Sequence, residues 1–223
     1  RESGFRLQLA GRRTIMVSSE DAKYHCEHHY SLKRNIIRTI HFAIPPGSEI
    51  QHQTARKVAD SYGLPQHFFF IPNQFYQHKN HELVLEAMAL LRQRGEHIVV
   101  AASGNQTDPR NPGYFPDFLN KLEKYHLENE FKLLGMIPYP HLLSLMCACT
   151  AMLNPSLFEG WSTTVEEARV TGTPMVLSDL AVHKEQMQNQ AIYFNRYSAQ
   201  SLADALSKCV QLSVEDRRFL SKA

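Results

Sequence analysis

Short apolar segments alternate with amphipathic ones from about residue 67 to residue 212. The apolar segments are rich in Val, Ile, Leu and Phe, which is typical of strands buried on both faces of a sheet. They predict strands at 67–72, 97–103, 131–135, 151–155, 174–178 and 191–194. The periodicity between them predicts helices at 79–94, 115–126, 139–148, 163–171 and 199–212. This alternation indicates an α/β fold with a Rossmann-like, doubly wound parallel sheet.

The first 44 residues have a different pattern, with a strand at 14–18, a polar helix to about residue 30 and a strand at 36–44. The turn-forming run Pro45-Pro46-Gly47-Ser48 separates them from a helix at 50–62. We therefore expect residues 1–44 to be the end of an incomplete N-terminal domain and residues 45–223 to form the sheet domain. A further helix is predicted to begin at Ser213.

The predicted topology selects two loops. Six parallel strands with right-handed crossovers most often take the order 3-2-1-4-5-6, and ligands bind beyond the carboxyl ends of strands one and four, where the winding reverses. The loops that follow those strands are residues 73–79 and 156–162. Because these loops also have the most unusual composition, containing Lys79 and Glu159, topology and composition select the same position.

The second loop has the features of a phosphate-binding site. Gly160 permits a close backbone approach. The helix that follows carries about half a positive charge at its N-terminus, and its exposed amides would be those of Trp161, Ser162, Thr163 and Thr164. Lys79 from the neighbouring loop adds a full positive charge.

Two carboxylates flank this site. Glu159 and Glu167 would repel a phosphate, so each should accept hydrogen bonds from sugar hydroxyls, and a nucleotide sugar combines a diphosphate with such hydroxyls. Thr163 and Glu166 match a capping box, in which Thr163 caps the helix and Glu166 reaches back. Taken singly, Glu167 would be explained by the helix dipole and Lys79 by solvent exposure. The combination on two adjacent loops favours a binding site.

The run Phe158-Glu-Gly-Trp-Ser-Thr-Thr-Val-Glu-Glu167 resembles the Glu-x7-Glu signature of the retaining GT-B glycosyltransferases, specifically glycosyltransferase family 4. The Thr-Gly-Thr-Pro step at 171–174, Lys79-Asn-His-Glu in the first helix and Leu134-Gly-Met-Ile-Pro138 after the third strand fit the same pattern. The resemblance extends from about residue 14 to residue 212.

The resemblance implies a two-domain enzyme that transfers a sugar, with retention, from a UDP- or GDP-type donor to an acceptor hydroxyl. Glu159 would contact the transferred sugar, Glu167 would hold the ribose, and Lys79 would bind the diphosphate. Catalysis would depend on Glu159 and Lys79, and no metal would be needed. The other implied donor-binding residues are Asn73, Gln74, Ile137, with Ile137 near the base, Gly160, Trp161, Ser162 and Thr163.

One position departs from the family pattern. The family usually has Gly-Arg after the first strand, where this chain has Asn73-Gln74. Gln74 can donate a hydrogen bond but brings no charge, so the diphosphate would be held more weakly or by a different arrangement.

Composition limits the partners and the location. The 24 basic and 22 acidic residues argue against a nucleic-acid binder, and no apolar run is long enough to cross a bilayer. The start lacks the apolar core of a signal peptide, and the four cysteines do not form a disulfide pattern. We expect a cytoplasmic protein, peripheral to the membrane at most, whose acceptor is a saccharide or a lipid-linked saccharide. Without the rest of the N-terminal domain, we expect weak nucleotide binding, no transfer and self-association.

Three alternatives remain open from the sequence. A sugar-nucleotide epimerase or a phosphorylase shares the GT-B fold, but its signature around the fourth strand differs. A non-catalytic nucleotide-binding or scaffold module is favoured by the Asn73-Gln74 replacement. His25, His28 and His29 fall on one helix face and could hold a metal, although the polar surroundings fit a solvated helix better.

Overall fold

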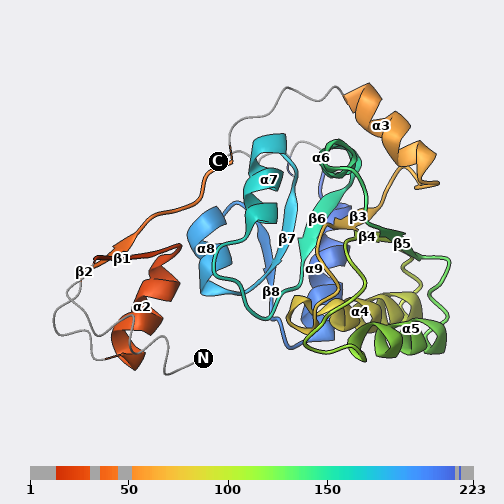
Figure 1. Cartoon of the computed structure of the whole chain (residues 1–223). Coiled ribbons are helices and arrows are strands. Elements are labelled where there is room, and N and C mark those ends of the chain that lie inside the picture. The colour runs from red at the N-terminus through yellow and green to blue at the C-terminus, as the bar shows by residue number, and fades with distance from the viewer. Residues whose placement is uncertain (1–13, 31–35, 45–51, 214–215, 217–223) are drawn as a thin grey trace.

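The computed structural model describes residues 14–30, 36–44, 52–213 and 216 (Figure 1). The start of the chain, the predicted linker at Pro45–Ser48 and most of the helix predicted from Ser213 lie outside these ranges.

A six-stranded sheet of parallel strands forms the centre of the molecule, and it confirms the predicted fold class. Its order is β5-β4-β3-β6-β7-β8, which is the predicted 3-2-1-4-5-6. β5 has the predicted bounds, and the other five strands are shorter than predicted, in part because Pro72, Pro155 and Pro174 have no N–H to donate to a ladder. Their bounds are β3 Phe69–Ile71, β4 Val100–Ser103, β5 Phe131–Gly135, β6 Ala151–Asn154, β7 Met175–Ser178 and β8 Ile192–Phe194.

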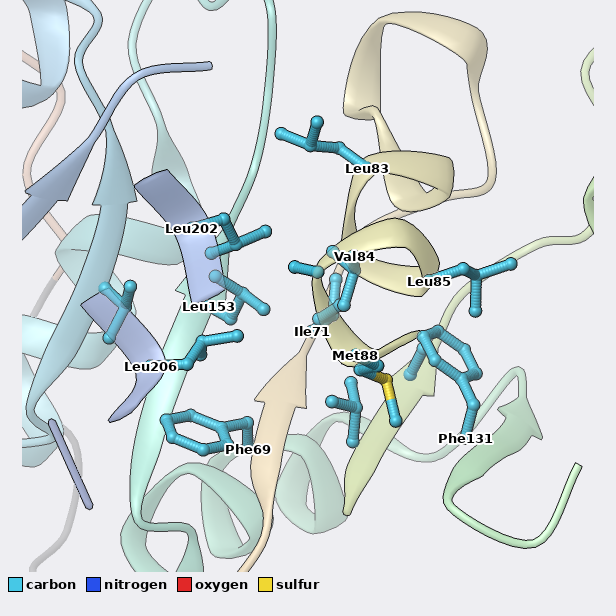
Figure 2. Close-up of a cluster of buried hydrophobic side chains, with 14 of the residues drawn as sticks. Phe69, Ile71, Leu83, Val84, Leu85, Met88, Phe131, Leu153, Leu202 and Leu206 are labelled. Carbon is cyan, nitrogen blue, oxygen red and sulfur yellow. The ribbon is translucent and has the colours of Figure 1, made fainter. Parts of the chain in front are cut away.

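Helices cover both faces of the sheet. Alternate strand residues face opposite sides, and because both sets are apolar, each face is buried under helices. Phe69 and Ile71 pack under α4 (His81–Gln93), α5 (Tyr114–Lys124) and α9 (Ala199–Gln211). Figure 2 shows apolar side chains of α4 and α9 meeting those of β3 and β6 there. Phe70 faces the other cluster, to which α3 (His52–Ser61), α6 (Tyr139–Ala148), α7 (Thr163–Thr171) and α8 (Ala181–Met187) contribute.

Two local features differ from the prediction. The sequence analysis missed α8, whose few residues include His183 and Gln186, polar side chains that the structure buries. The helix predicted from residue 79 begins at His81, after the 3-10 turn η1 (Gln77–Lys79). Asn80 separates the two in a left-handed conformation with φ 59°, and its side-chain amide donates to the Arg196 carbonyl at 3.1 Å.

The N-terminal part forms a separate two-stranded parallel sheet of β1 (Thr14–Val17) and β2 (Ile36–Thr39). Between them lies α2 (Glu20–His29), which Ser19 caps by accepting a hydrogen bond from the Ala22 amide at 3.0 Å. In Figure 1 this part lies beside α8, away from the edge of the large sheet that β5 forms. The domain boundary after residue 44 stays a prediction.

No helix in the described ranges is both long enough and apolar enough to cross a lipid bilayer.

Candidate functional site

The loops after β3 and β6 lie side by side at the carboxyl edge of the sheet. Their strands are direct neighbours, with Phe69 opposite Ala151 and Phe70 opposite Met152. Beyond the strands, the Leu157 amide donates to the His78 carbonyl at 2.8 Å and ties the two loops together. The two loops that the topology selects are therefore bonded to each other.

Lys79 and Glu159, the two residues predicted to do the chemistry, form an ion pair across these loops. Lys79 Nζ lies 2.6 Å from Glu159 Oε1, and their side chains are only 16% and 10% exposed. The same carboxylate oxygen lies 2.8 Å from Ser156 Oγ. The sequence analysis placed these residues on one site but did not foresee that each would be the other's partner.

Asn154, at the end of β6, organises the floor of the site. Its Oδ1 accepts from Asn73 Nδ2 at 3.3 Å and from Ser156 Oγ at 2.6 Å. Its Nδ2 donates to Ser162 Oγ at 3.0 Å and Thr164 Oγ1 at 3.4 Å. Asn154 is fully buried, so its amide connects the β3 loop, the Glu159 loop and the start of α7. Sequence reasoning missed this residue, although an amide ending an apolar strand was visible.

The start of α7 departs from the predicted capping box. Ser162, not Thr163, is the N-cap, and it makes no side-chain capping bond. Glu166 does not reach back, because it is buried against α8, where it accepts from Gln186 Nε2 at 2.8 Å and pairs with Arg169. The Ser162 amide donates to Gln186 Oε1 at 3.2 Å. An anion here would therefore meet the amides of Thr163, Thr164 and Val165, which have no intrahelical acceptor, whereas the Glu166 amide donates to the Ser162 carbonyl.

Glu167, the second predicted carboxylate, lies on α7 next to Tyr139 at the start of α6. Burial raises the pKa of Glu167, and a hydrogen bond from Tyr139 opposes part of that rise. Burial and the Glu167 charge raise the pKa of Tyr139. Ile137, predicted to lie near a base, is half-buried just before Tyr139. Glu167 and Tyr139 thus contact each other across α7 and the start of α6.

Asn73 and Gln74 are engaged within the protein. The Asn73 side chain is buried against Asn154. Gln74 Oε1 accepts from the Asn105 amide at 2.5 Å, which ties the β3 loop to the loop after β4. In this structure both side chains therefore brace the site.

Gly160 and Trp161 contact the N-terminal part of the chain. The Gly160 carbonyl accepts from Ser18 Oγ at 2.9 Å, and Trp161 Nε1 donates to the Phe42 carbonyl at 3.0 Å. The Trp161 ring also stacks on His41, with the ring centroids 4.3 Å apart. The side chain of Trp161 thus packs against the N-terminal segment. We call the contacts of Ser18, His41 and Phe42 with Gly160 and Trp161 the clasp.

Glu185 of α8 completes this contact. Its carboxylate accepts from the Glu20 amide at the first residue of α2, at 2.9 and 3.0 Å, and lies 2.9 Å from His41 Nε2. A carboxylate at a helix N-terminus is stabilised by the helix dipole. The clasp therefore joins α2 and α8 as well as the Glu159 loop.

Two buried histidines lie behind the ion pair. Burial lowers the pKa of His183 to about 4, and its Nδ1 lies 3.0 Å from the Ser178 carbonyl. Burial lowers the pKa of His81 to about 3, and its ring stacks on Phe75 with centroids 4.2 Å apart. Both rings are thus neutral at pH 7, so they add no charge to the site.

No group of His, Cys, Asp or Glu in the described residues has the arrangement of a metal site. On α2 the rings of His25 and His29 stack on each other, 5.6 Å apart, at the surface.

The sequence profile described as "Glycosyl transferases group 1" matches residues 51–223, which is most of the chain. The chain belongs to this family. The match includes both loops of the candidate site and the whole of the large sheet.

Two curated relatives of this glycosyltransferase domain are similar over part of its length. The O-antigen chain mannosyltransferase RfbU of Salmonella typhimurium is 29% identical over 93 residues, 42% of this chain and 26% of the relative. The GPI3 subunit of the Saccharomyces cerevisiae phosphatidylinositol N-acetylglucosaminyltransferase is 25% identical over 99 residues, 44% of this chain and 22% of the relative.

Solved structures show that the fold is that of GT-B glycosyltransferases. A Rickettsia africae glycosyltransferase superposes with a TM-score of 0.78 and 14% identity, over 94% of this chain and 56% of its own. Anabaena HepE, in complex with UDP and glucose, superposes with a TM-score of 0.79 and 16% identity over the same shares. The chain therefore spans about half the length of these proteins.

Proposed function

We propose that this protein is the donor-binding part of a glycosyltransferase that moves a sugar from a nucleoside diphosphate to an acceptor hydroxyl. The observation that carries the proposal is the Lys79–Glu159 ion pair, at 2.6 Å, where the loops after β3 and β6 meet in a group 1 glycosyl transferase domain. A cation beside a carboxylate at a switch point suits a ligand with a phosphate next to a sugar.

Each charged residue has a separate part in this proposal. Lys79 has three N–H donors, so it can remain bonded to Glu159 and also donate to a phosphate oxygen. Glu159 would then accept from hydroxyls of the transferred sugar. Glu167, half-buried on the β5 side, would accept from the ribose hydroxyls, with Ile137 near the base. UDP in Anabaena HepE supports a nucleoside diphosphate as the ligand class.

The reaction itself follows from these positions. The bond between the anomeric carbon and the diphosphate oxygen breaks through an oxocarbenium-like state, and Lys79 with the amides of α7 stabilises the charge that develops on the diphosphate. The acceptor oxygen attacks from the same face, and its proton passes to the departing diphosphate. The anomeric configuration is thereby retained, as expected for glycosyltransferase family 4.

Titration of the chain with UDP, GDP and ADP by calorimetry tests the proposal. We expect one of the three to bind and its sugar derivative to compete. Lys79→Ala should weaken that binding by about tenfold or more, because a charge-assisted hydrogen bond contributes roughly 1.5–3 kcal/mol. Lys124→Ala, an exposed lysine on α5, is the matched control and should bind normally.

Absence of binding by all three nucleotides would favour the scaffold alternative and reject the proposal. Incubation of the full-length enzyme with the sugar nucleotide, followed by product analysis, then separates transfer to water or acceptor from conversion into an epimeric sugar nucleotide.

A further inference from the structure

The Lys79 site is short of positive charge for a diphosphate. The Lys79 ammonium is already paired with Glu159 at 2.6 Å, and the start of α7 offers about half a charge. Gln74, which stands where an arginine would supply a second cation, is neutral, and its amide oxygen is bound to Asn105. A diphosphate bound here would gain from a further cationic hydrogen-bond donor supplied by another element.

The loop after β4, residues 104–113, is built directly onto the loop that carries Lys79. The Asn105 carbonyl accepts from the Phe75 amide at 2.9 Å, and its amide donates to Gln74. Gly104, at φ +145°, lies so close that a Cβ atom there would be 2.5 Å from the Asn73 carbonyl oxygen. The loop after β4 therefore has a fixed position relative to the loop that contains Lys79.

Arg110 is the cation of that loop, and it is fixed from two sides. Its amide and its Nε donate to Asp108 Oδ1 at 3.0 and 3.1 Å, and the Asp108 side chain is only 3% exposed. Its guanidinium carbon lies 4.8 Å from the centre of the Tyr76 ring. Tyr76 immediately precedes the η1 turn that ends in Lys79. Cation–π contact and a buried carboxylate hold the guanidinium over the Tyr76 ring, next to the start of this turn.

The guanidinium still has capacity for a ligand. Its side chain is 58% exposed, and within the described residues Nη1 has no hydrogen-bond partner. Burial and then the Lys79 charge lower the pKa of His78, and Arg110 contributes more weakly, while Glu159 and Asp108 oppose the shift. Lys79 and Arg110 therefore both act electrostatically on His78, which lies in the η1 turn.

We propose that Arg110 is the second cation of the diphosphate site, supplied from the β4 loop. This inference rests on the proposed function and names a further binding residue for it. A guanidinium presents paired N–H donors that match two phosphate oxygens. Asp108 and Tyr76 hold it in place, so little rotamer freedom is lost when the ligand binds.

Calorimetry with the nucleoside diphosphate that the chain binds best, and with its monophosphate, tests this assignment. Arg110→Gln should weaken diphosphate binding at least tenfold and monophosphate binding by a clearly smaller factor. Arg110→Lys should recover part of the loss, because the charge is restored without the paired donors. Arg94→Gln removes an arginine that is likewise paired with an aspartate, Asp204, at 2.8 Å, and should leave both affinities unchanged.

The outcomes separate this inference from the proposed function. If the unaltered chain binds no nucleoside diphosphate, the proposed function fails. If the unaltered chain binds and Arg110→Gln binds equally well, only the role of Arg110 is wrong. An equal loss for the diphosphate and the monophosphate would show that Arg110 merely braces the loop. Circular dichroism of each variant confirms that it is folded before the affinities are compared.

Discussion

Lys79 and Glu159 each neutralise a charge that would otherwise lie largely buried at the carboxyl edge of the sheet. The pair joins a loop after β3 to a loop after β6, 80 residues later in the chain. A ligand that brings phosphate and hydroxyl groups can therefore engage both side chains, because they are already aligned.

Removing one member of this pair should destabilise the fold. Lys79→Met leaves the Glu159 carboxylate without its cation, and we expect a loss of about 3 kcal/mol in the free energy of unfolding. The double variant Lys79→Met/Glu159→Gln should lose less than the sum of the single variants, since neither charge remains. Urea denaturation measures this coupling, and strictly additive losses would mean that the pair is not an interacting unit in solution.

Asn154 should be necessary for the shape of the site as well as for stability. Asn154→Ala removes the amide that joins Asn73, Ser156 and Ser162, and it leaves buried partners unsatisfied at a cost of about 1–3 kcal/mol each. We expect a lower melting temperature and weaker nucleotide binding. Asn189→Ala changes an exposed asparagine and is the control. Unchanged nucleotide affinity in Asn154→Ala would show that the floor of the site can rearrange.

His183 should make the protein sensitive to acid. Burial lowers its pKa in the folded protein to about 4, below the value of 6.5 in the unfolded chain. The unfolded state therefore binds more protons in this range, so stability is fully present above pH 6.5 and is lost as the pH falls toward 4. His183→Asn retains an N–H donor for the Ser178 carbonyl without the titration. Its free energy of unfolding should fall less between pH 6.5 and 4; a slope equal to that of the unaltered chain would contradict the assignment.

Glu167 should make the folded protein less stable as the pH rises through its raised pKa. Its pKa is raised above 4.5 by burial, so the folded state holds the proton to higher pH than the unfolded state does. Stability from this group is present at low pH and is lost as the pH rises through the raised pKa. Glu167→Gln should remove that loss, and it should also weaken nucleoside diphosphate binding, because an amide is a poorer acceptor for ribose hydroxyls. Denaturation and calorimetry on the same samples test both effects.

Trp161 offers a direct optical test of the clasp. It is the single tryptophan of the sequence, so tryptophan fluorescence reports on its surroundings, which include the stacking with His41 and the hydrogen bond to the Phe42 carbonyl. His41→Ala should change its emission maximum and increase its access to a soluble quencher such as iodide. His97→Ala, at an exposed histidine elsewhere, should not. Identical quenching in all three proteins would show that the His41 ring does not cover Trp161 in solution.

Much of the fold could be predicted because the apolar strands and their spacing leave few topologies. The predicted strand order also places the loops that contain Lys79 and Glu159 next to each other. What escaped prediction depends on contacts between distant residues. Gln186 and Glu166, from two different helices, bond to each other and displace the expected capping box. The partnership of Trp161 with His41 joins residues 120 positions apart, and no local pattern encodes it.

The strands that precede the Lys79 and Glu159 loops, β3 and β6, are the two middle members of the sheet, and each is paired on both sides. The outermost strands, β5 and β8, have one neighbour each and can open first when the protein is heated or strained. Unfolding would thus begin at the edge strands, and the Lys79 and Glu159 loops after the central strands would be among the last parts of the sheet domain to unfold.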